Sequence, residues 1–291
     1  MTAASLSTDH PGWTSIVSDR CYRPMSDGRG ATWLVSWTGQ AVDFAPLTGR
    51  ASLPDLTYAD PDELPQTAPR ELTQTLSTLG TIVRVSNPSL WDAVFVSILR
   101  QRQTAPGASR ELYRRLSTLH GVPCESPRGP LHFAPTAQTV LNLPDDAFGR
   151  TGAGFFQTAL QSAAAAFVIH GDALTRPTGQ ELVTALMSIG QVGPWTAASA
   201  AADYTGDFAL YPHHDAALRH CALRAAPDLT TPRDKKAFAR QWSAWATTPP
   251  HRHTLTLATL AFGDHAPTSG TRTGTIAPPS RHSPTSPVSA S

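Results

Sequence analysis

An aspartate, Asp215, stands directly after two histidines, His213 and His214, and directly before a run of helix-forming residues. A carboxylate in such a place can stabilise a positive charge on a bound molecule, or orient and deprotonate a water molecule. The amino end of a helix helps to keep such an acid ionised, because its unpaired amides are partly positive. By spacing alone, an ordinary helix cap is the more frequent role of an aspartate here.

The neighbouring histidines suggest a proton relay or a metal site, since both use histidine beside a carboxylate. His213, His214 and Asp215, even with His220 added, do not have a recognised zinc spacing. We therefore expect no metal, and we expect His214 to face a nucleic-acid backbone or the edge of a pocket.

Upstream of Asp215, the sequence predicts two helices joined by a tight turn. Thr178 and Glu181 have the spacing of a capping box, so a helix should begin there. Apolar residues follow at helical intervals, at Leu182, Ala185, Leu186 and Ile189. Gly190 and Gly193 bracket the turn, and Pro194 suits the first turn of the next helix because its missing N–H would be unpaired there.

Such a unit can bind a phosphate. A turn of small residues lets backbone approach backbone closely, and the unpaired amides at the start of the second helix favour an anion. A nucleic-acid phosphate fits, and this contact reads position rather than base sequence. The candidate backbone-binding residues are Gly190, Gln191, Val192, Gly193 and Thr196.

The stretch Val192-Gly193-Pro194-Trp195-Thr196-Ala197, followed by Asp207-Phe208 and Pro212-His213-His214-Asp215, resembles the helix-hairpin-helix (HhH-GPD) DNA glycosylases. The chain is most similar to the AlkA-like 3-methyladenine DNA glycosylase II branch, as a divergent member, from about Pro88 to Gly263. The resemblance implies that Asp215 is the catalytic carboxylate. It would stabilise the oxocarbenium character of the deoxyribose while the base leaves.

The same resemblance suggests roles for other side chains. Trp195 occupies the position where bifunctional relatives carry a lysine that forms a Schiff base, which implies a monofunctional enzyme without lyase activity. An indole there can also stack on a cationic alkylated base. Gln101 matches a glutamine that faces the DNA and the lesion, although a surface or helix-capping role is an alternative. The candidates for the base pocket are Trp195, Gln101, Tyr211, His214 and Trp91, and the aromatic ones could equally be core.

The chain departs from the family pattern in the turn itself. The family turn usually reads Pro-Gly-Ile-Gly, whereas residues 190–193 read Gly-Gln-Val-Gly, with Gln191 at the first hairpin glycine. If that site has a positive φ, Gln191 costs roughly 1 kcal/mol. Near Trp245, Ala244 and Ala246 replace a proline and an arginine of the family's Trp-x-Pro-Trp-Arg element.

Cysteine usage indicates no cofactor. Some relatives carry a four-cysteine iron–sulfur loop, but here Cys21, Cys124 and Cys221 are scattered. We therefore expect neither an iron–sulfur cluster nor any other cofactor.

The hydrophobic patterns predict a mainly α fold in three parts: a small β-rich N-terminal segment and linker (1–70), a helical HhH-GPD glycosylase domain (71–265) and a disordered tail (266–291). Residues 32–37 and 40–44 predict a β-hairpin. Residues 53–70, rich in proline and acids, predict a linker. The tail contains mainly Pro, Ser, Thr and Gly and cannot build a core.

Within the helical part, residues 71–85 are predicted to form the first helix, and residues 155–170 a long alanine-rich helix that ends at Gly171. The clearest helix opens at Asn87-Pro88-Ser89. Its apolar face consists of Trp91, Val94, Phe95, Ile98 and Leu99.

Charge is weakly informative about partners. The 291 residues carry a net charge of +1, but residues 1–79 hold five arginines against nine acids, or −4, which leaves +5 for the remainder. A modest basic surface suits a DNA binder that touches few phosphates. The N-terminus lacks the pattern of a signal peptide, and no apolar run reaches membrane-spanning length.

Together these features predict a cytoplasmic, nucleoid-associated monomer that binds double-stranded DNA with damaged bases and does not bind membranes. The expected function is that of a monofunctional DNA N-glycosylase in base excision repair, which flips out and releases alkylated purines such as 3-methyladenine. Two alternatives remain open: a non-catalytic helix-hairpin-helix DNA-binding protein, and a related glycosylase for deaminated or oxidised bases.

Overall fold

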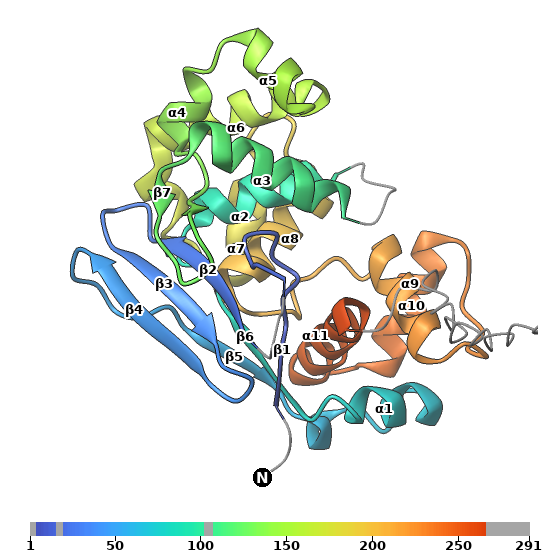
Figure 1. Ribbon diagram of the computed structural model, residues 1–291. Coiled ribbons are helices and arrows are strands. Elements are labelled where there is room, and N and C mark those ends of the chain that lie inside the picture. The colour runs from blue at the N-terminus through green and yellow to red at the C-terminus, as the bar shows by residue number, and fades with distance from the viewer. Residues whose placement is uncertain (1–3, 16–19, 102–106, 266–291) are drawn as a thin grey trace, which may run out of the picture.

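The computed structural model describes residues 4–15, 20–101 and 107–265, and about half of them are helical (Figure 1). The predicted disordered tail lies outside the described residues. The N-terminal part contributes two three-stranded sheets, which lie below and to the left of the main helices in Figure 1. The mainly α class with a small β-rich N-terminal part is therefore confirmed.

The predicted β-hairpin is part of an antiparallel meander. Its strands, in spatial order, are β2 (Cys21–Ser26), β3 (Thr32–Trp37) and β4 (Val42–Thr48). The inward side chains of β3 are Trp33, Val35 and Trp37, which alternate with less buried residues, as expected for a sheet with one face in the core.

The second sheet corrects two predictions. It has the order β1 (Ala4–Leu6), β6 (Thr81–Val85) and β5 (Leu56–Ala59), with β1 parallel to β6 and β5 antiparallel to it. Residues 53–70 therefore contain a strand, followed by a short 3-10 helix η1 (Pro61–Glu63), rather than forming only a linker.

The predicted helix at 71–85 is wrong in its second half. Helix α1 (Arg70–Ser77) ends before Gly80, whose φ of 66° breaks the helix, and the β-branched run that follows pairs as β6. The division of the chain into domains at residue 70 stays a prediction.

Two hydrophobic cores lie in the helical part. The first unites α2 (Leu90–Arg100), α3 (Ala108–His120), α4 (Ala137–Leu141), α5 (Asp145–Thr151), η2 (Gly154–Phe156), α6 (Gln157–Leu174), α7 (Gly179–Met187) and α8 (Pro194–Thr205). The second unites α1 with α9 (Ala216–Ala225), α10 (Lys235–Trp245) and α11 (Pro249–His265). A two-stranded ribbon, β7 (Pro123–Cys124) and β8 (Leu131–His132), connects α3 to α4.

Helix α8 joins the two cores. Ala197, Ala200 and Ala201 belong to the first core, whereas Ala202 belongs to the second. Side chains this small let α8 lie close to helices on both sides. The residues that follow α8 must therefore pass between the two cores.

The clearest predicted helix is confirmed as α2. Ser89 is its N-cap, and the Ser89 hydroxyl accepts a hydrogen bond from the Asp92 amide at 3.2 Å. Helix α6 continues past Gly171 to Leu174, so the predicted end at Gly171 is wrong. No helix of the described residues is both long and apolar enough to span a bilayer.

Candidate active site

The two helices and the turn between them form as predicted. Thr178 is the N-cap of α7, but no side chain completes the expected capping box. Gly193 is the N-cap of α8, Pro194 is its first residue, and Gly206 ends it with a φ of 74°. A Cβ on Gly190 would lie 2.8 Å from the Ser162 hydroxyl, so a glycine here allows α6 to pass close to the turn.

Gln191 has a φ of 68°, so the residue at the family's glycine position does adopt the left-handed conformation. We assign it a cost of about 1 kcal/mol. Part of this cost is offset by Gln101 at the C-cap of α2, whose side-chain amide donates to the Gln191 carbonyl at 3.2 Å and to the Thr196 hydroxyl at 2.9 Å. Gln101 therefore caps α2 and holds the turn.

The five candidate backbone-binding residues differ in exposure. Gly190, Gln191 and Gly193 are exposed, whereas Val192 and Thr196 are buried and anchor the turn. The first-turn amides of α8 lack intrahelical partners by geometry, and no side chain caps them. The exposed turn thus presents a partly positive backbone surface.

Asp215 occupies the N-cap position of α9, but its side chain does not cap that helix. Instead, Oδ1 accepts a hydrogen bond from the Trp195 indole at 3.2 Å, and Oδ2 accepts one from the Tyr211 hydroxyl at 2.7 Å. Only 9% of Asp215 is exposed. The structure thus brings together three of the predicted site residues, from the start of α8 and from the loop before α9.

Tyr211 and His213, in the loop that ends at Asp215, stay neutral at physiological pH. Burial, and then the charge of Asp215, raise the pKa of Tyr211 well above its usual value. Burial, and then Arg252 and His214, lower the pKa of His213 to about 4. The carboxylate of Asp215 therefore has two neutral hydrogen-bond donors, which fix its position without cancelling its charge.

No protein-family model matches the chain, and no curated protein is similar to it in sequence. Solved structures are similar. A 3-methyladenine DNA glycosylase from Archaeoglobus fulgidus aligns with a TM-score of 0.63 at 14% identity, over 88% of this chain and 90% of that one. MBOgg1 bound to a low-affinity DNA ligand aligns with a TM-score of 0.61 at 15% identity, over 88% of this chain and 89% of that one.

A Clostridium acetobutylicum 8-oxoguanine glycosylase/lyase, bound to DNA with cytosine opposite 8-oxoguanine, aligns with a TM-score of 0.58 at 12% identity, over 85% of this chain and 86% of that one. The fold is that of these DNA glycosylases. Because the identities are low and the neighbours act on different bases, the likeness establishes the glycosylase fold and singles out no branch.

In this glycosylase fold, Trp91 lies apart from the other candidates for the base pocket. It is near the N-terminal end of α2, about 15 Å along the helix from Gln101 at the rise of an α-helix. Its indole donates to the Pro135 carbonyl at 2.8 Å. His214 is half-buried beside Asp215 in the chain. The structure therefore gathers Trp195 and Tyr211 around Asp215, with Gln101 behind the turn and Trp91 elsewhere.

Sequence reasoning missed the use of the Tyr211 hydroxyl, which was expected only as an aromatic surface for the base. The i, i+4 spacing of Tyr211 and Asp215 was an available signal. It also missed a buried ionic cluster at the other end of α8. There Arg84 pairs with Asp203 and, at 2.9 Å, with Asp9, while the Asn87 amide donates to both Asp203 and Asp92 at 3.0 Å.

Within the described residues, no group of three or more His, Cys, Asp or Glu side chains is placed to hold a metal ion.

Proposed function

We propose that the protein is a monofunctional DNA N-glycosylase that hydrolyses the N-glycosidic bond of alkylated purines such as 3-methyladenine. The observation that carries this proposal is the placement of Asp215. A nearly buried carboxylate, held by Trp195 and Tyr211, stands beside a phosphate-binding type of turn in a glycosylase fold.

The chemistry follows from the fixed charge. When the base of a flipped nucleotide leaves, it takes the electron pair of the glycosidic bond, and positive charge develops on the deoxyribose. The Asp215 carboxylate stabilises that charge in a site of low polarity. Water then adds to the sugar and loses a proton to solvent, which leaves an abasic site. An alkylated, cationic purine needs no added proton to leave, so electrostatic stabilisation suffices.

The absence of lyase chemistry rests on the lysines of the sequence. Its two lysines, Lys235 and Lys236, are both exposed at the start of α10. Trp195, at the position of the Schiff-base lysine, has no amine and uses its N–H for Asp215. We therefore expect the DNA strand to remain intact after base release, and borohydride to trap no covalent complex.

The decisive experiment measures base release from methylated duplex DNA and from duplexes that carry hypoxanthine, uracil or 8-oxoguanine. Asp215→Asn keeps the size of the side chain but removes its charge. Base release should fall at least about 100-fold, or roughly 2.7 kcal/mol, while DNA binding persists. The matched control is Asp207→Asn, in the same loop, because Asp207 bonds the Ala209 amide rather than the site.

Base release by Asp215→Asn at the wild-type rate would contradict a catalytic role. A second function has one observation in its favour, since two of the similar structures are MBOgg1 and an 8-oxoguanine enzyme. Selective release of 8-oxoguanine from the same panel would assign the protein to oxidised bases instead.

A further inference from the structure

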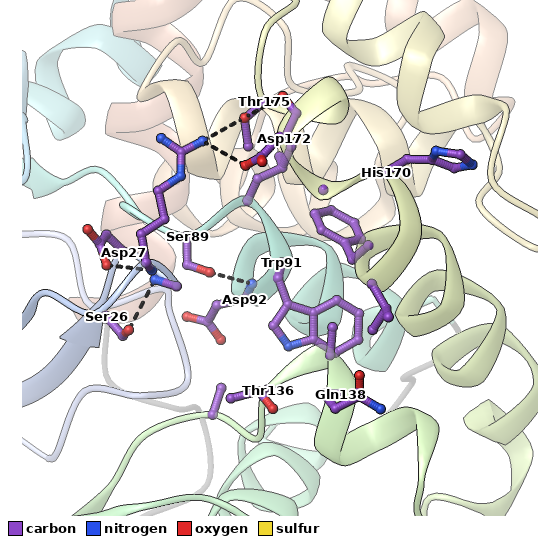
Figure 2. A pocket seen from close by; sticks show the side chains of 18 of the residues that line it. Ser26, Asp27, Ser89, Trp91, Asp92, Thr136, Gln138, His170, Asp172 and Thr175 are labelled. Carbon is purple, nitrogen blue, oxygen red and sulfur yellow. Dashed lines mark hydrogen bonds and ion pairs between the residues drawn. The ribbon is translucent and has the colours of Figure 1, made fainter.

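A cavity of about 590 Å³ lies at the N-terminal end of α2, away from the turn that Gln101 holds (Figure 2). The loop between β2 and β3, the start of α2, the start of α4 and the end of α6 form its walls. Its size is within the range of about 300–1,000 Å³ that is typical of small-molecule sites.

One wall of the cavity is aromatic. Trp91, Phe133 and Phe167 line it, and Trp91 packs edge-on against Phe167 with ring centroids 5.5 Å apart. The hydrogen bond from the indole to the Pro135 carbonyl fixes the Trp91 ring. Trp91 nevertheless stays half-buried, so part of its ring is open to the cavity. A fixed aromatic wall binds a flat ring without losing side-chain entropy.

Three carboxylates also line the cavity: Asp27 in the loop between β2 and β3, Asp92 next to Trp91 on α2, and Asp172 near the end of α6 (Figure 2). Backbone amides of Arg29 and Ala31 donate to Oδ1 of Asp27, at 2.7 and 3.0 Å. This arrangement orients the carboxylate and leaves its second oxygen without a hydrogen bond in the described part of the chain. Among the described residues, Asp27 also has no ion-pair partner.

The Asp92 carboxylate is ionised, and it already interacts with His10 and Arg23. Burial alone would raise its pKa, yet His10 and Arg23 outweigh burial and lower the pKa to about 2. Two arginines, Arg29 and Arg176, also line the cavity. Arg29 spans the rim, donating to the Thr175 hydroxyl at 2.9 Å and pairing with Asp172 at 3.8 Å. The carboxyl end of α6, which favours cations, faces the same space.

We propose that this cavity binds a small aromatic amine in its protonated form. The ring of the ligand lies against Trp91, where an adjoining positive charge gains a cation–π attraction. The ammonium group donates to the free oxygen of Asp27, because a charge-assisted hydrogen bond is stronger than a neutral one. An anion is disfavoured because the three carboxylates of the lining outnumber its two arginines, of which Arg29 already has partners.

The test uses 2-phenylethylammonium as the probe and 2-phenylethanol as its neutral counterpart of the same size. Binding to the full chain is measured by ligand-observed NMR and titration calorimetry at pH 7. The ammonium compound should bind at least tenfold more tightly than the alcohol. Asp27→Asn should weaken the ammonium compound about tenfold and leave the alcohol unchanged. Asp43→Asn, an exposed aspartate on β4 outside the cavity, is the matched control and should change neither.

A second variant tests the place of binding. Ala137→Phe puts a ring into the cavity from the first residue of α4, and it should abolish binding of both compounds while circular dichroism shows an intact fold. Three results would each overturn the proposal: no binding of the ammonium compound at millimolar concentration, equal binding of amine and alcohol, or full binding by Asp27→Asn.

Discussion

The two ends of helix α8 hold their aspartates in opposite ways. At the carboxyl end, Asp203 is buried in ion pairs and hydrogen bonds with Arg84 and Asn87. At the other end, Trp195 lies about 12 Å from Asp203 along the helix at the rise of an α-helix. There Asp215 meets the Trp195 indole and the Tyr211 hydroxyl, and within the described residues it has no ion pair.

The charge of Asp203 therefore serves the structure, whereas the charge of Asp215 is the one that we propose to take part in the reaction. The Arg84 cation neutralises the charge of Asp203, so the carboxyl end of α8 has a structural role only. Neutral donors orient Asp215 without cancelling its charge, as the proposed reaction requires. Because α8 is a single helix, the buried cluster also fixes the direction in which the exposed turn points.

The largest effect should come from breaking the buried end. Asp203→Ala leaves Arg84, only 2% exposed, without one of its two carboxylates. We expect the free energy of unfolding in urea to fall by about 3 kcal/mol, the lower end of the usual cost of breaking a buried ion pair, because Arg84 keeps its pair with Asp9. Asp215→Asn should change it by less than about 1 kcal/mol. Comparable losses from the two variants would remove the distinction between the ends of α8.

Acidification should lower the free energy of unfolding in two stages, through groups at both ends of α8. Burial, and then Arg23, lower the pKa of His10, and burial lowers that of His213 to about 4. The unfolded chain therefore binds protons below about pH 6.5 that the folded chain does not, so stability falls with a slope of up to about 1.4 kcal/mol per pH unit for each histidine.

The carboxylates of the buried end act in the second stage. Burial alone would raise the pKa of Asp203, but Arg84 outweighs it and holds the pKa below the usual range. This contribution is complete above about pH 4 and disappears as the pH falls further. Urea unfolding between pH 3 and 8 measures both stages. His213→Asn should reduce only the first stage, the loss of stability below about pH 6.5. A free energy of unfolding that is constant from pH 7 to 4.5 would contradict the assignment of this stage to the histidines.

Removing one donor from Asp215 should have a smaller effect, on rate rather than stability. Tyr211→Phe keeps the ring in the second core but leaves Oδ2 without its partner. We expect single-turnover base release to fall about tenfold, or about 1.4 kcal/mol, with little change in DNA affinity. A rate equal to that of the wild type would make the tyrosine a packing residue only.

The smallest change concerns the strained turn at the exposed end. Gln191→Gly relieves a φ of 68° and should raise the free energy of unfolding by about 0.5–1 kcal/mol. Gln180→Gly, at an exposed and regular position of α7, is the matched control and should lower it by about 1 kcal/mol. If both substitutions destabilise the protein alike, the turn is not strained.

The sequence was most informative where local chemistry decides the structure. The turn at 190–193, the start of α8 at Pro194 and the start of α2 near Ser89 follow from the residues themselves. The positive φ of Gln191 was raised as a condition, through the comparison with the family's turn. Asp215 was singled out by the resemblance of the turn and of Pro212-His213-His214-Asp215 to the glycosylase pattern, and its catalytic role stays a prediction.

Long-range pairing was not predictable in the same way. Strand β5 is short and lies among prolines, so it is recognisable only through its partner β6. The cluster around Arg84 joins Asp9 and Asp203, which lie far from it in the sequence, and no local pattern connects them. In sequence, Trp91 fits both a base pocket and a core, and only the length of α2 places it away from Asp215, in the cavity at the N-terminal end of that helix.

The parallel pairing of β1 with β6 affects the order in which the molecule can fold. Ala4 lies opposite Thr81, so the first strand finds its partner only after the chain between them has closed a long loop. During synthesis, this strand leaves the ribosome well before β6 exists and must wait unpaired. Strand β1, although it is made before β6, is thus among the later segments to reach its native place, and the ion pair between Asp9 and Arg84 then holds it there.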